Sequence, residues 1–442
     1  MDVALVPLLT VALCVVVVCS FVVTRYSGSH AQLLVGSLVA HLGAALVNLW
    51  LVLRVYGYGD LLMYHQYGSD LSEALSIDFV GVFPGIVQVL FQGDNPLSVY
   101  IPAEGSDVAS MVALCSLVCF VFGNDLLATS LAYAVGSFVG KLALLQGFLE
   151  SVPSRMHTHV LIGTMLVPSS VFWSSGIIKE AVVVPALGLY VLGLLRLVRG
   201  RTSGLAALIA GAVVVSLIKA YLMLILVGAT GVYLYARRAF VRGQVTVRPL
   251  WLLVGIGVVV GGMMAVGEMF PRFSMERLAE ETARLQAASL NPLGGSTYSI
   301  GDPGAATYVG QLAYVPQALF TGWFRPLIFE ARNPQMLING LETAGFLALS
   351  LYVVATRGLH RMARIVMRNP ILAFCLAFAV VCGIATGLTS ANLGTLSRYR
   401  MPLVPFLATA LIVFVRTPVA RPTGRWPSRT RPTVRNGSRG IR

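Results

Sequence analysis

The stretch VALVPLLTVALCVVVVCSFVV, from Val3 to Val23, decides the class of fold. It contains no charged residue, and about 20 apolar residues suffice for a helix to cross a hydrocarbon core about 30 Å thick. No basic segment precedes it, and it carries no Ala-x-Ala-like site. The run is therefore typical of a retained membrane span and not of a cleaved signal peptide.

Runs of the same kind recur along the chain and predict an all-α, polytopic transmembrane helical bundle. Leu205–Tyr235 is too long for one span and is interrupted by Lys219, so we expect it to cross twice as a hairpin. Two shorter apolar pieces are ambiguous, namely Phe79–Gly93 and Val108–Gly123. Either both cross the membrane as a hairpin, which gives about 13 spans, or neither crosses it, which gives about 11. The other expected spans are Leu33–Val55, Leu126–Phe148, Val160–Gly176, Ala181–Val198, Leu250–Gly267, Leu337–Val354, Ile371–Leu388 and Met401–Val415.

The composition supports this fold class. Of the 442 residues, 57% are hydrophobic and 11% are charged, whereas about a quarter of a soluble chain is charged. A water-soluble fold is excluded on that basis, and so is a wholly disordered chain, which needs low hydrophobicity. The six cysteines all lie in apolar runs with no zinc-ligand spacing, so we expect small buried hydrophobic side chains.

The net charge of +14 would suggest nucleic acid in a soluble protein, but in a membrane protein the arginines mark the cytoplasmic loops. We therefore expect no nucleic-acid partner. The expected inner clusters are Arg196–Arg201, Arg237–Arg248, Arg357–Arg368 and the tail after Arg416, which has no acidic residue. This orientation places the C-terminus in the cytoplasm and most other charges on the outer side.

One domain is expected over residues 1–415, followed by a disordered, basic cytoplasmic tail over 416–442 that is attracted to anionic lipid. The domain includes one long outer loop, residues 270–335. Within that loop we expect a helix from Ser274 to Leu290, capped by Ser274, and a Gly/Ser/Asn/Pro-rich connection over 291–304.

The first candidate site follows the second span, from Tyr58 to Gly68. If this segment is helical, Asp60, Tyr64 and Tyr67 share one face, and His65 lies beside them. The Asp60 carboxylate is a candidate general base for an acceptor hydroxyl, or a ligand for a divalent cation against a diphosphate. The alternative is an interfacial aromatic belt with a helix-capping aspartate.

The second candidate is Lys179–Glu180, between two apolar helices. Adjacent residues do not face each other on a helix, so we do not expect the two to pair. Lys179 is a candidate phosphate ligand and Glu180 a candidate cap for the next helix, whose dipole favours it. Lys219 is a further candidate for an anion such as a lipid-linked pyrophosphate. A turn at interfacial water and snorkelling of Lys219 are the simpler alternatives.

Two further segments carry cations on the expected outer side. Phe320–Asn333 contains Arg325, Glu330 and Arg332 among aromatic residues, a set suited to sugar faces and phosphate, or else an aromatic-anchored re-entry into the membrane. Before the last span lie Arg398 and Arg400. Arginines on the outer side depart from the positive-inside trend, which makes Arg398 the leading candidate for phosphate contact.

These elements together resemble a known group of proteins. The elements are Gly59-Asp60-x-x-x-Tyr-His, Pro168-Ser-x-x-Phe-Trp-Ser-Ser-Gly-x-x-Lys-Glu180, Phe324-Arg-Pro…Glu-Ala-x-Asn333 and Arg398-Tyr-Arg-x-Pro…Pro405. From Tyr58 to Pro405 the chain resembles bacterial polytopic proteins of surface-polysaccharide assembly, namely C-type glycosyltransferases and O-antigen-polymerase-like proteins. Asp60 has no adjacent acidic residue, unlike the paired acids of many such transferases, and Lys219 replaces the usual hairpin arginine.

The resemblance implies a glycosyltransferase or polysaccharide polymerase that acts on polyprenyl-linked sugars at the outer face of the bacterial inner membrane. Exopolysaccharide synthesis and contacts with other glycan-assembly proteins belong to the same implication. The expected catalytic residues are Asp60, His65 and Glu180, and no metal ligands are assigned, although a divalent cation at Asp60 stays an alternative. The expected substrate-binding residues are Tyr64, Lys179, Lys219, Arg325, Glu330, Arg332, Arg398 and Arg400. The alternatives are a transporter or flippase for a lipid-linked glycan and a non-catalytic membrane subunit.

Overall fold

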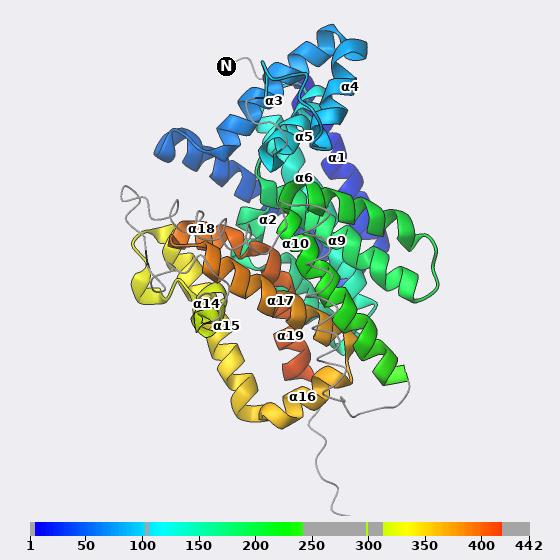
Figure 1. Ribbon diagram of the computed structural model, residues 1–442, viewed down its shortest axis with the longest axis vertical. Helices are drawn as coiled ribbons and strands as arrows, with labels where there is room; N and C mark the ends of the chain where they lie inside the picture. The colour runs from blue at the N-terminus through cyan, green and yellow to red at the C-terminus, as the bar shows by residue number, and fades with distance from the viewer. Residues whose placement is uncertain (1–4, 102–105, 242–297, 299–312, 418–442) are drawn as a thin grey trace, which may run out of the picture.

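The computed structural model describes residues 5–101, 106–241, 298 and 313–417, and this part is all-helical (Figure 1). Eight of its helical segments are long and apolar enough to cross a membrane, so the chain is a multi-pass membrane protein. The helices of these segments are α1 (Leu5–Arg25), α2 (Gly28–Leu51), α6 (Leu126–Leu149), α9 (Lys179–Val198), α10 (Gly204–Val241), α15 (Pro334–Arg357), α17 (Pro370–Thr389), and α18 (Leu393–Tyr399) with α19 (Val404–Arg416).

Shorter helices connect these segments. They are α3 (Asp60–Ile77), α4 (Phe79–Leu90), α5 (Asp107–Phe122), α7 (His157–Met165), α8 (Pro168–Trp173), α14 (Val315–Phe324) and α16 (Leu359–Met367). Single turns lie at Val52–Tyr56, Ser154–Met156, Ile328–Glu330 and Met401–Leu403. The apolar helices α4 and α5 correspond to the two ambiguous pieces of the sequence and stay below the length of a full span.

One expected span, predicted as a single helix, is interrupted in the structure. The segment Val160–Gly176 is divided into α7 and α8 at Leu166 and Val167. Pro168 begins α8; a proline lacks the backbone donor and disfavours helical geometry in the residue before it. Val167 is accordingly extended, with ψ at 123°. The expected span Leu250–Gly267, the helix Ser274–Leu290, the connection 291–304 and the tail beyond Thr417 lie outside the described residues.

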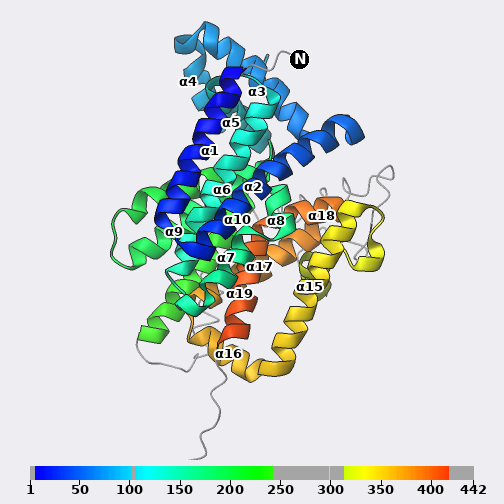
Figure 2. The same ribbon diagram turned by 180° about the vertical axis from the view of Figure 1, so that it is seen from behind.

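The centre of the bundle is formed by α6, α9 and α10, which approach closely at glycines. A Cβ added at Gly140 of α6 would lie 2.0 Å from the Cα of Pro185, and one added at Gly188 would lie 2.0 Å from the carbonyl oxygen of Gly140. Small residues let membrane helices pack at van der Waals distance. Figure 2 shows α1 and α2 along the outside, beside α6, where many large apolar side chains are exposed as a lipid-facing surface requires.

The hairpin expected at Lys219 is confirmed, because α10 consists of two helices that meet at a break at this residue. Lys219 has φ −147° and ψ 74°, which are not helical values. The second half runs beside α9, since the Tyr190 and Thr230 hydroxyls lie 3.0 Å apart and Arg237 donates to the carbonyl oxygen of Val198. The break at Lys219 therefore lies near the start of α9, and Arg237 lies near the end of α9.

The bundle has two chemically different ends. At one, which we call the arginine end, α6, α9, α15 and α19 finish and α16 lies across (Figure 1). At the other lie α18 and the starts of α3 and α9. The 20 residues of α9 span about 30 Å at 1.5 Å per residue, the thickness of a hydrocarbon core. The helix thus holds the two sets of charges on opposite sides of such a layer.

Candidate functional site

Four charged side chains from four separate elements form one cluster at the end opposite the arginine end. Glu180, in the first turn of α9, lies at its centre. Lys219 Nζ donates to Glu180 Oε1 over 2.6 Å, and Arg398 Nε donates to Glu180 Oε2 over 2.8 Å. Arg398 Nη1 donates to Asp60 Oδ2 over 2.7 Å. We call Asp60, Arg398, Glu180 and Lys219 the charge cluster.

Local structure explains how each member reaches the cluster. The break in α10 puts Lys219 at the tip of the hairpin, with its ammonium also 4.7 Å from the ring centroid of Tyr399. Arg398 extends from α18, which Asn392 caps by accepting from the backbone N–H of Gly394 and Thr395. Asp60 is the first residue of α3, where a helix dipole favours a carboxylate.

Exposure falls steadily across the charge cluster. The Asp60 side chain is 43% exposed, that of Arg398 is 20% exposed, and that of Glu180 is fully buried. Buried charges are tolerated only when they are paired and hydrogen-bonded, and both oxygens of Glu180 are bound to cations. Asp60 Oδ1 accepts no hydrogen bond from any described residue. The cluster thus offers one reachable carboxylate oxygen and one reachable guanidinium, held by a buried pair.

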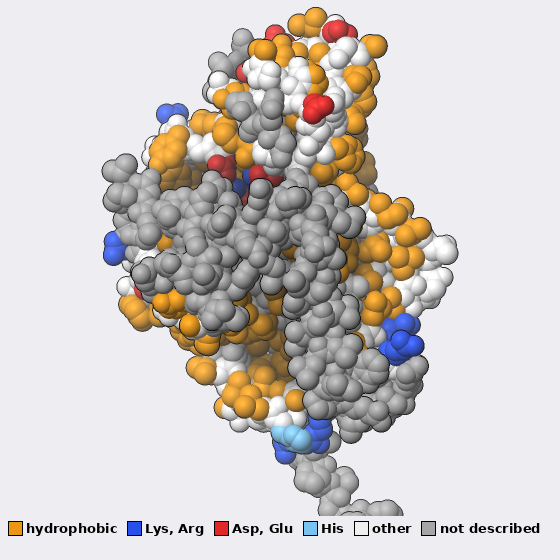
Figure 3. Space-filling model, viewed as in Figure 1, with side chains coloured by type: hydrophobic (Ala, Val, Ile, Leu, Met, Phe, Trp, Pro, Cys, Tyr) orange, Lys and Arg blue, Asp and Glu red, His pale blue; other side chains and the backbone are white. Residues whose placement is uncertain are grey.

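Figure 3 shows the surroundings on one face of the molecule. Acidic and basic side chains meet there at the junction between the part formed by α3, α4 and α5 and the main bundle, whereas most of the coloured surface nearby is apolar. On the same face a separate group of basic side chains lies at the opposite end. Most of the ion pairs among the described residues lie at the charge-cluster end, and the pair between Arg199 and Glu150 lies at the arginine end.

Lys179 and Glu180 do not pair with each other, as their spacing predicts. Lys179 Nζ instead lies 2.5 Å from Asp107 Oδ2, at the start of α5. The interpretation of Glu180 as a helix cap is wrong: Ile178 occupies the cap position of α9 without a side-chain bond. Two cations brought in from α10 and α18 take both carboxylate oxygens instead.

The two other candidates on α3 differ in their positions. Tyr64 is buried in the core beneath Asp60, and burial followed by the nearby Asp60 charge raises the pKa of its phenol. His65 points toward the turn at Asn124 and Asp125, and burial lowers its pKa, so its ring is neutral at neutral pH. His65 forms no contact with the charge cluster.

A second group of polar side chains lies where α14 meets α15. Arg325 pairs with Glu330 and stacks on the ring of Tyr298, 4.2 Å from its centroid. Burial raises the pKa of Glu330, but hydrogen bonds from Arg325 and from the backbone of Leu327 outweigh it and lower the pKa overall. Arg332 is exposed just before α15. The candidates Arg325 and Glu330 therefore meet, with their charges mutually neutralised.

Arg400 is fully buried and faces this second group. Its Nη1 donates to the backbone oxygen of Arg325 over 2.6 Å, and its Nη2 lies 4.0 Å from Glu342 Oε1. Glu342 in turn accepts from the backbone N–H and the hydroxyl of Ser169. The guanidinium of Arg400 does not reach the surface, so this residue ties α15, the loop after α14 and α18 together.

Sequence reasoning missed a buried pair in the middle of the bundle. Lys141 on α6 is fully buried, and its ammonium donates to His41 Nε2 over 3.1 Å and to the carbonyl oxygen of Ser170 over 2.7 Å. His41 Nδ1 lies 2.7 Å from the carbonyl oxygen of Ser37, which can only accept, so the ring is neutral. The signal was available: an ionisable residue inside an apolar span is a candidate functional group.

No group of three or more His, Cys, Asp or Glu side chains within the described ranges is arranged to hold a metal ion. At Asp60 the neighbouring charge is the Arg398 guanidinium, which takes Oδ2 and leaves Oδ1 without a hydrogen bond from the described residues. What the described geometry offers at this site is the Asp60 carboxylate beside the Arg398 guanidinium, a set suited to a phosphate ester and a proton acceptor.

Comparison of the chain with protein-family models, with curated proteins and with solved structures found no match in any of the three.

Proposed function

We propose that the chain is an integral-membrane glycosyltransferase or polysaccharide polymerase that uses polyprenyl-linked sugars at the outer face of the bacterial inner membrane. The observation that carries the proposal is the charge cluster, in which a reachable carboxylate at Asp60 lies beside a reachable cation at Arg398. The motif resemblance from Tyr58 to Pro405 supports the same reaction class.

The chemistry assigns a separate role to each side chain. Asp60 Oδ1 accepts the proton of the acceptor hydroxyl as its oxygen forms a bond to the anomeric carbon of the donor sugar. The bond from that carbon to the phosphate oxygen breaks, and the polyprenyl phosphate or diphosphate leaves as an anion. Arg398 binds this anion, because a guanidinium offers two parallel donors to phosphate oxygens.

Glu180 and Lys219 act as positioning residues in this proposal. Glu180 is buried beneath the cluster and fixes Arg398 through its Nε, which leaves an edge of the guanidinium for substrate. Lys219 neutralises the other oxygen of Glu180 and adds positive potential to the anion site. His65, Arg325 and Arg400 have no part in this chemistry, since they bind other groups or stay buried.

A second candidate function has its own supporting observation. The buried Lys141–His41 pair and the interrupted helices at Val167 and Lys219 are features of membrane transporters, in which broken helices and buried ionisable groups form the substrate or ion path. A transporter for a lipid-linked glycan would use the same cations to bind phosphate without breaking a bond.

The test uses purified protein in lipid nanodiscs with polyprenyl phosphate and polyprenyl diphosphate carrying a labelled hexose. With a sugar or a lipid-linked sugar added as acceptor, we expect transfer of the label to this acceptor and release of one polyprenyl phosphate or diphosphate for each bond formed. Asp60→Asn lowers the rate by about 10²–10⁴, the range for losing a general base. Asp70→Asn, on the same helix but exposed and outside the cluster, is the matched control and keeps the rate.

The outcomes separate the candidates. Movement of intact labelled lipid across proteoliposomes, with no release of lipid phosphate, establishes the transporter and overturns the enzyme. Equal turnover by Asp60→Asn and Asp70→Asn removes Asp60 from the mechanism. Retention of folding by each variant is checked by its gel-filtration profile, so that loss of rate reports on chemistry.

A further inference from the structure

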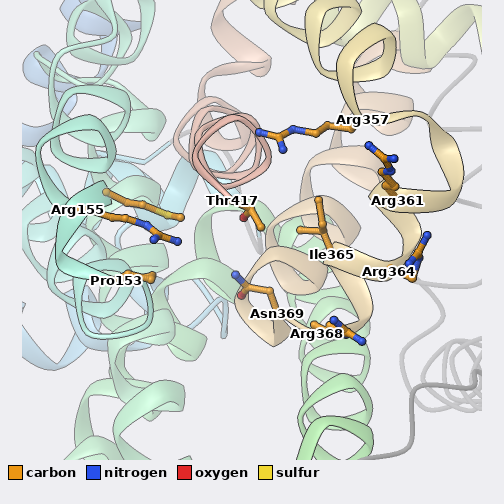
Figure 4. A pocket seen from close by; sticks show the side chains of 10 residues that line it. Pro153, Arg155, Arg357, Arg361, Arg364, Ile365, Arg368, Asn369 and Thr417 are labelled. Carbon is orange, nitrogen blue, oxygen red and sulfur yellow. The ribbon is translucent and has the colours of Figure 1, made fainter. Parts of the chain in front are cut away.

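A pocket of about 350 Å³ lies at the arginine end, far from the charge cluster. Figure 4 shows the arginines that line it, which come from three separate segments. Arg155 comes from the turn before α7, Arg357 from the end of α15, and Arg361, Arg364 and Arg368 from α16 and the residue after it. Its lining contains no acidic side chain. We call these five residues the arginine pocket.

Helix α16 gives the pocket its form. Arg361, Arg364 and Arg368 recur at spacings of three and four, so they lie along one side of the helix. Met362 and Ile365 pack against the core, and no residue of α16 is fully buried. A short helix with an apolar face on the bundle and a basic face outward is typical of an element that lies in the membrane interface.

The arginine pocket differs from the charge-cluster end of the bundle in how its cations are paired with anions. At the charge-cluster end Lys179, Lys219, Arg325 and Arg398 each contact a carboxylate. Of the pocket arginines, only Arg357 makes a side-chain bond within the described part of the chain, to the carbonyl oxygen of Val415 over 2.6 Å. Five neighbouring cations without a carboxylate repel one another, and an anion bound between them removes that repulsion.

Orientation in the membrane does not by itself account for this arrangement. The positive-inside trend needs arginines in loops on one side, and Arg201 and Arg238 meet that need without lining this pocket. It does not require arginines from three segments to line one open pocket. Several guanidinium groups that line one pocket are instead suited to phosphate, which they bind through pairs of parallel hydrogen bonds.

We propose that the arginine pocket binds a phosphate group, and that the group is the head of an anionic phospholipid from the adjoining leaflet. The interfacial position of α16 favours a lipid, because basic pockets between membrane helices on this side hold anionic head groups. The site is separate from the proposed transferase site and does not depend on that function.

The test measures binding to delipidated protein in a neutral detergent. The probes are phosphatidylglycerol, phosphatidylcholine and inorganic pyrophosphate, each titrated while the midpoint of thermal unfolding is followed. We expect phosphatidylglycerol to raise the midpoint in a saturable way and phosphatidylcholine to leave it unchanged. Saturation by pyrophosphate at the same site, with no effect of the lipid, supports a phosphate site but overturns the lipid as its occupant.

Paired variants make the result specific. Arg361→Gln with Arg364→Gln removes two pocket charges, and each arginine near a membrane surface contributes about fivefold in affinity, so we expect about twenty-fivefold weaker binding. Arg201→Gln with Arg238→Gln removes two charges at the same end outside the pocket and keeps the affinity. Equal weakening by both pairs, or no binding of either phosphate probe, overturns the proposal. Unliganded midpoints no lower than that of the wild type show that the variants fold.

Discussion

Replacement of Glu180 by glutamine is the sharpest perturbation of the charge cluster. The side chain keeps its size but loses its charge, which leaves Lys219 and Arg398 without a central counter-charge. Glu180 is fully buried and accepts charge-assisted hydrogen bonds at 2.6 and 2.8 Å. Such bonds contribute about 1.5–3 kcal/mol each, and breaking a buried pair by removing one partner costs about 3–5 kcal/mol.

We therefore expect Glu180→Gln to lower the free energy of unfolding by about 3–5 kcal/mol. The assay is equilibrium unfolding in mixed micelles of a neutral detergent and dodecyl sulfate, followed by helical circular dichroism. Glu150→Gln is the matched control, because the side chains of Glu150 and Arg199 are 24% and 30% exposed. Partly solvated pairs contribute about 1 kcal/mol or less. A cost for Glu180→Gln no larger than that of the control would refute the reasoning.

A double-mutant cycle tests the same point without relying on one variant. Glu180→Gln combined with Lys219→Gln removes the counter-charge and one of the cations it balances. We expect the double variant to cost less than the sum of the two single variants by about 0.5–3 kcal/mol, the range for side chains in contact. Additive costs would show that the ammonium and the carboxylate do not interact in the folded protein.

Two further predictions address helix packing and the second polar group. Gly140→Ala places a Cβ against Pro185 and lowers the free energy of unfolding by about 1–3 kcal/mol, whereas Gly136→Ala on the same helix meets no atom within 4 Å and is neutral or stabilising in the same unfolding assay. The Glu330 carboxyl, whose pKa is lowered by Arg325 against its burial, stabilises the fold fully above the ordinary carboxyl pKa and loses this effect as pH falls through the folded-state value. The stability difference between wild type and Glu330→Gln, measured from pH 7 to pH 3, is expected to shrink only over that acidic window.

The sequence pattern was sufficient for the elements whose physics is local. Apolar length predicted the long helices, and the position of Lys219 between two arginine clusters predicted a hairpin with the lysine at its tip. The same reasoning was wrong for Val160–Gly176, because a run of apolar residues indicates burial in the membrane but does not show that the helix is continuous. Pro168 carried the missing information, since it disfavours helix in the residue before it.

The candidate site shows where sequence reasoning stops. Asp60, Glu180 and Arg398 were each recognisable as charges at a membrane boundary, but their meeting depends on helix packing between residues more than 200 positions apart, such as Glu180 and Arg398. Glu180 was interpreted as a cap of the helix that begins beside it, because no local sequence pattern shows that a cation from a distant part of the chain will contact it. Lys141 itself was recognisable as an ionisable residue inside an apolar span, but its partners, His41 and the carbonyl oxygen of Ser170, come from two other helices and had no local signal.

The proposed function requires the charge cluster to lie on the outer side of the membrane, and the positive-inside trend then puts the arginine pocket on the cytoplasmic side. A cysteine introduced at Tyr58, two residues before Asp60, or at Leu359 on α16 reports on one side each, because both side chains are highly exposed and neither belongs to the charge cluster or the arginine pocket. The measurement is labelling by a membrane-impermeant maleimide in right-side-out and inverted vesicles, with wild type as the background. We predict that Tyr58→Cys is labelled only in right-side-out vesicles and that Leu359→Cys is labelled only in inverted vesicles. The reverse pattern, or labelling of both from one side, would contradict the account.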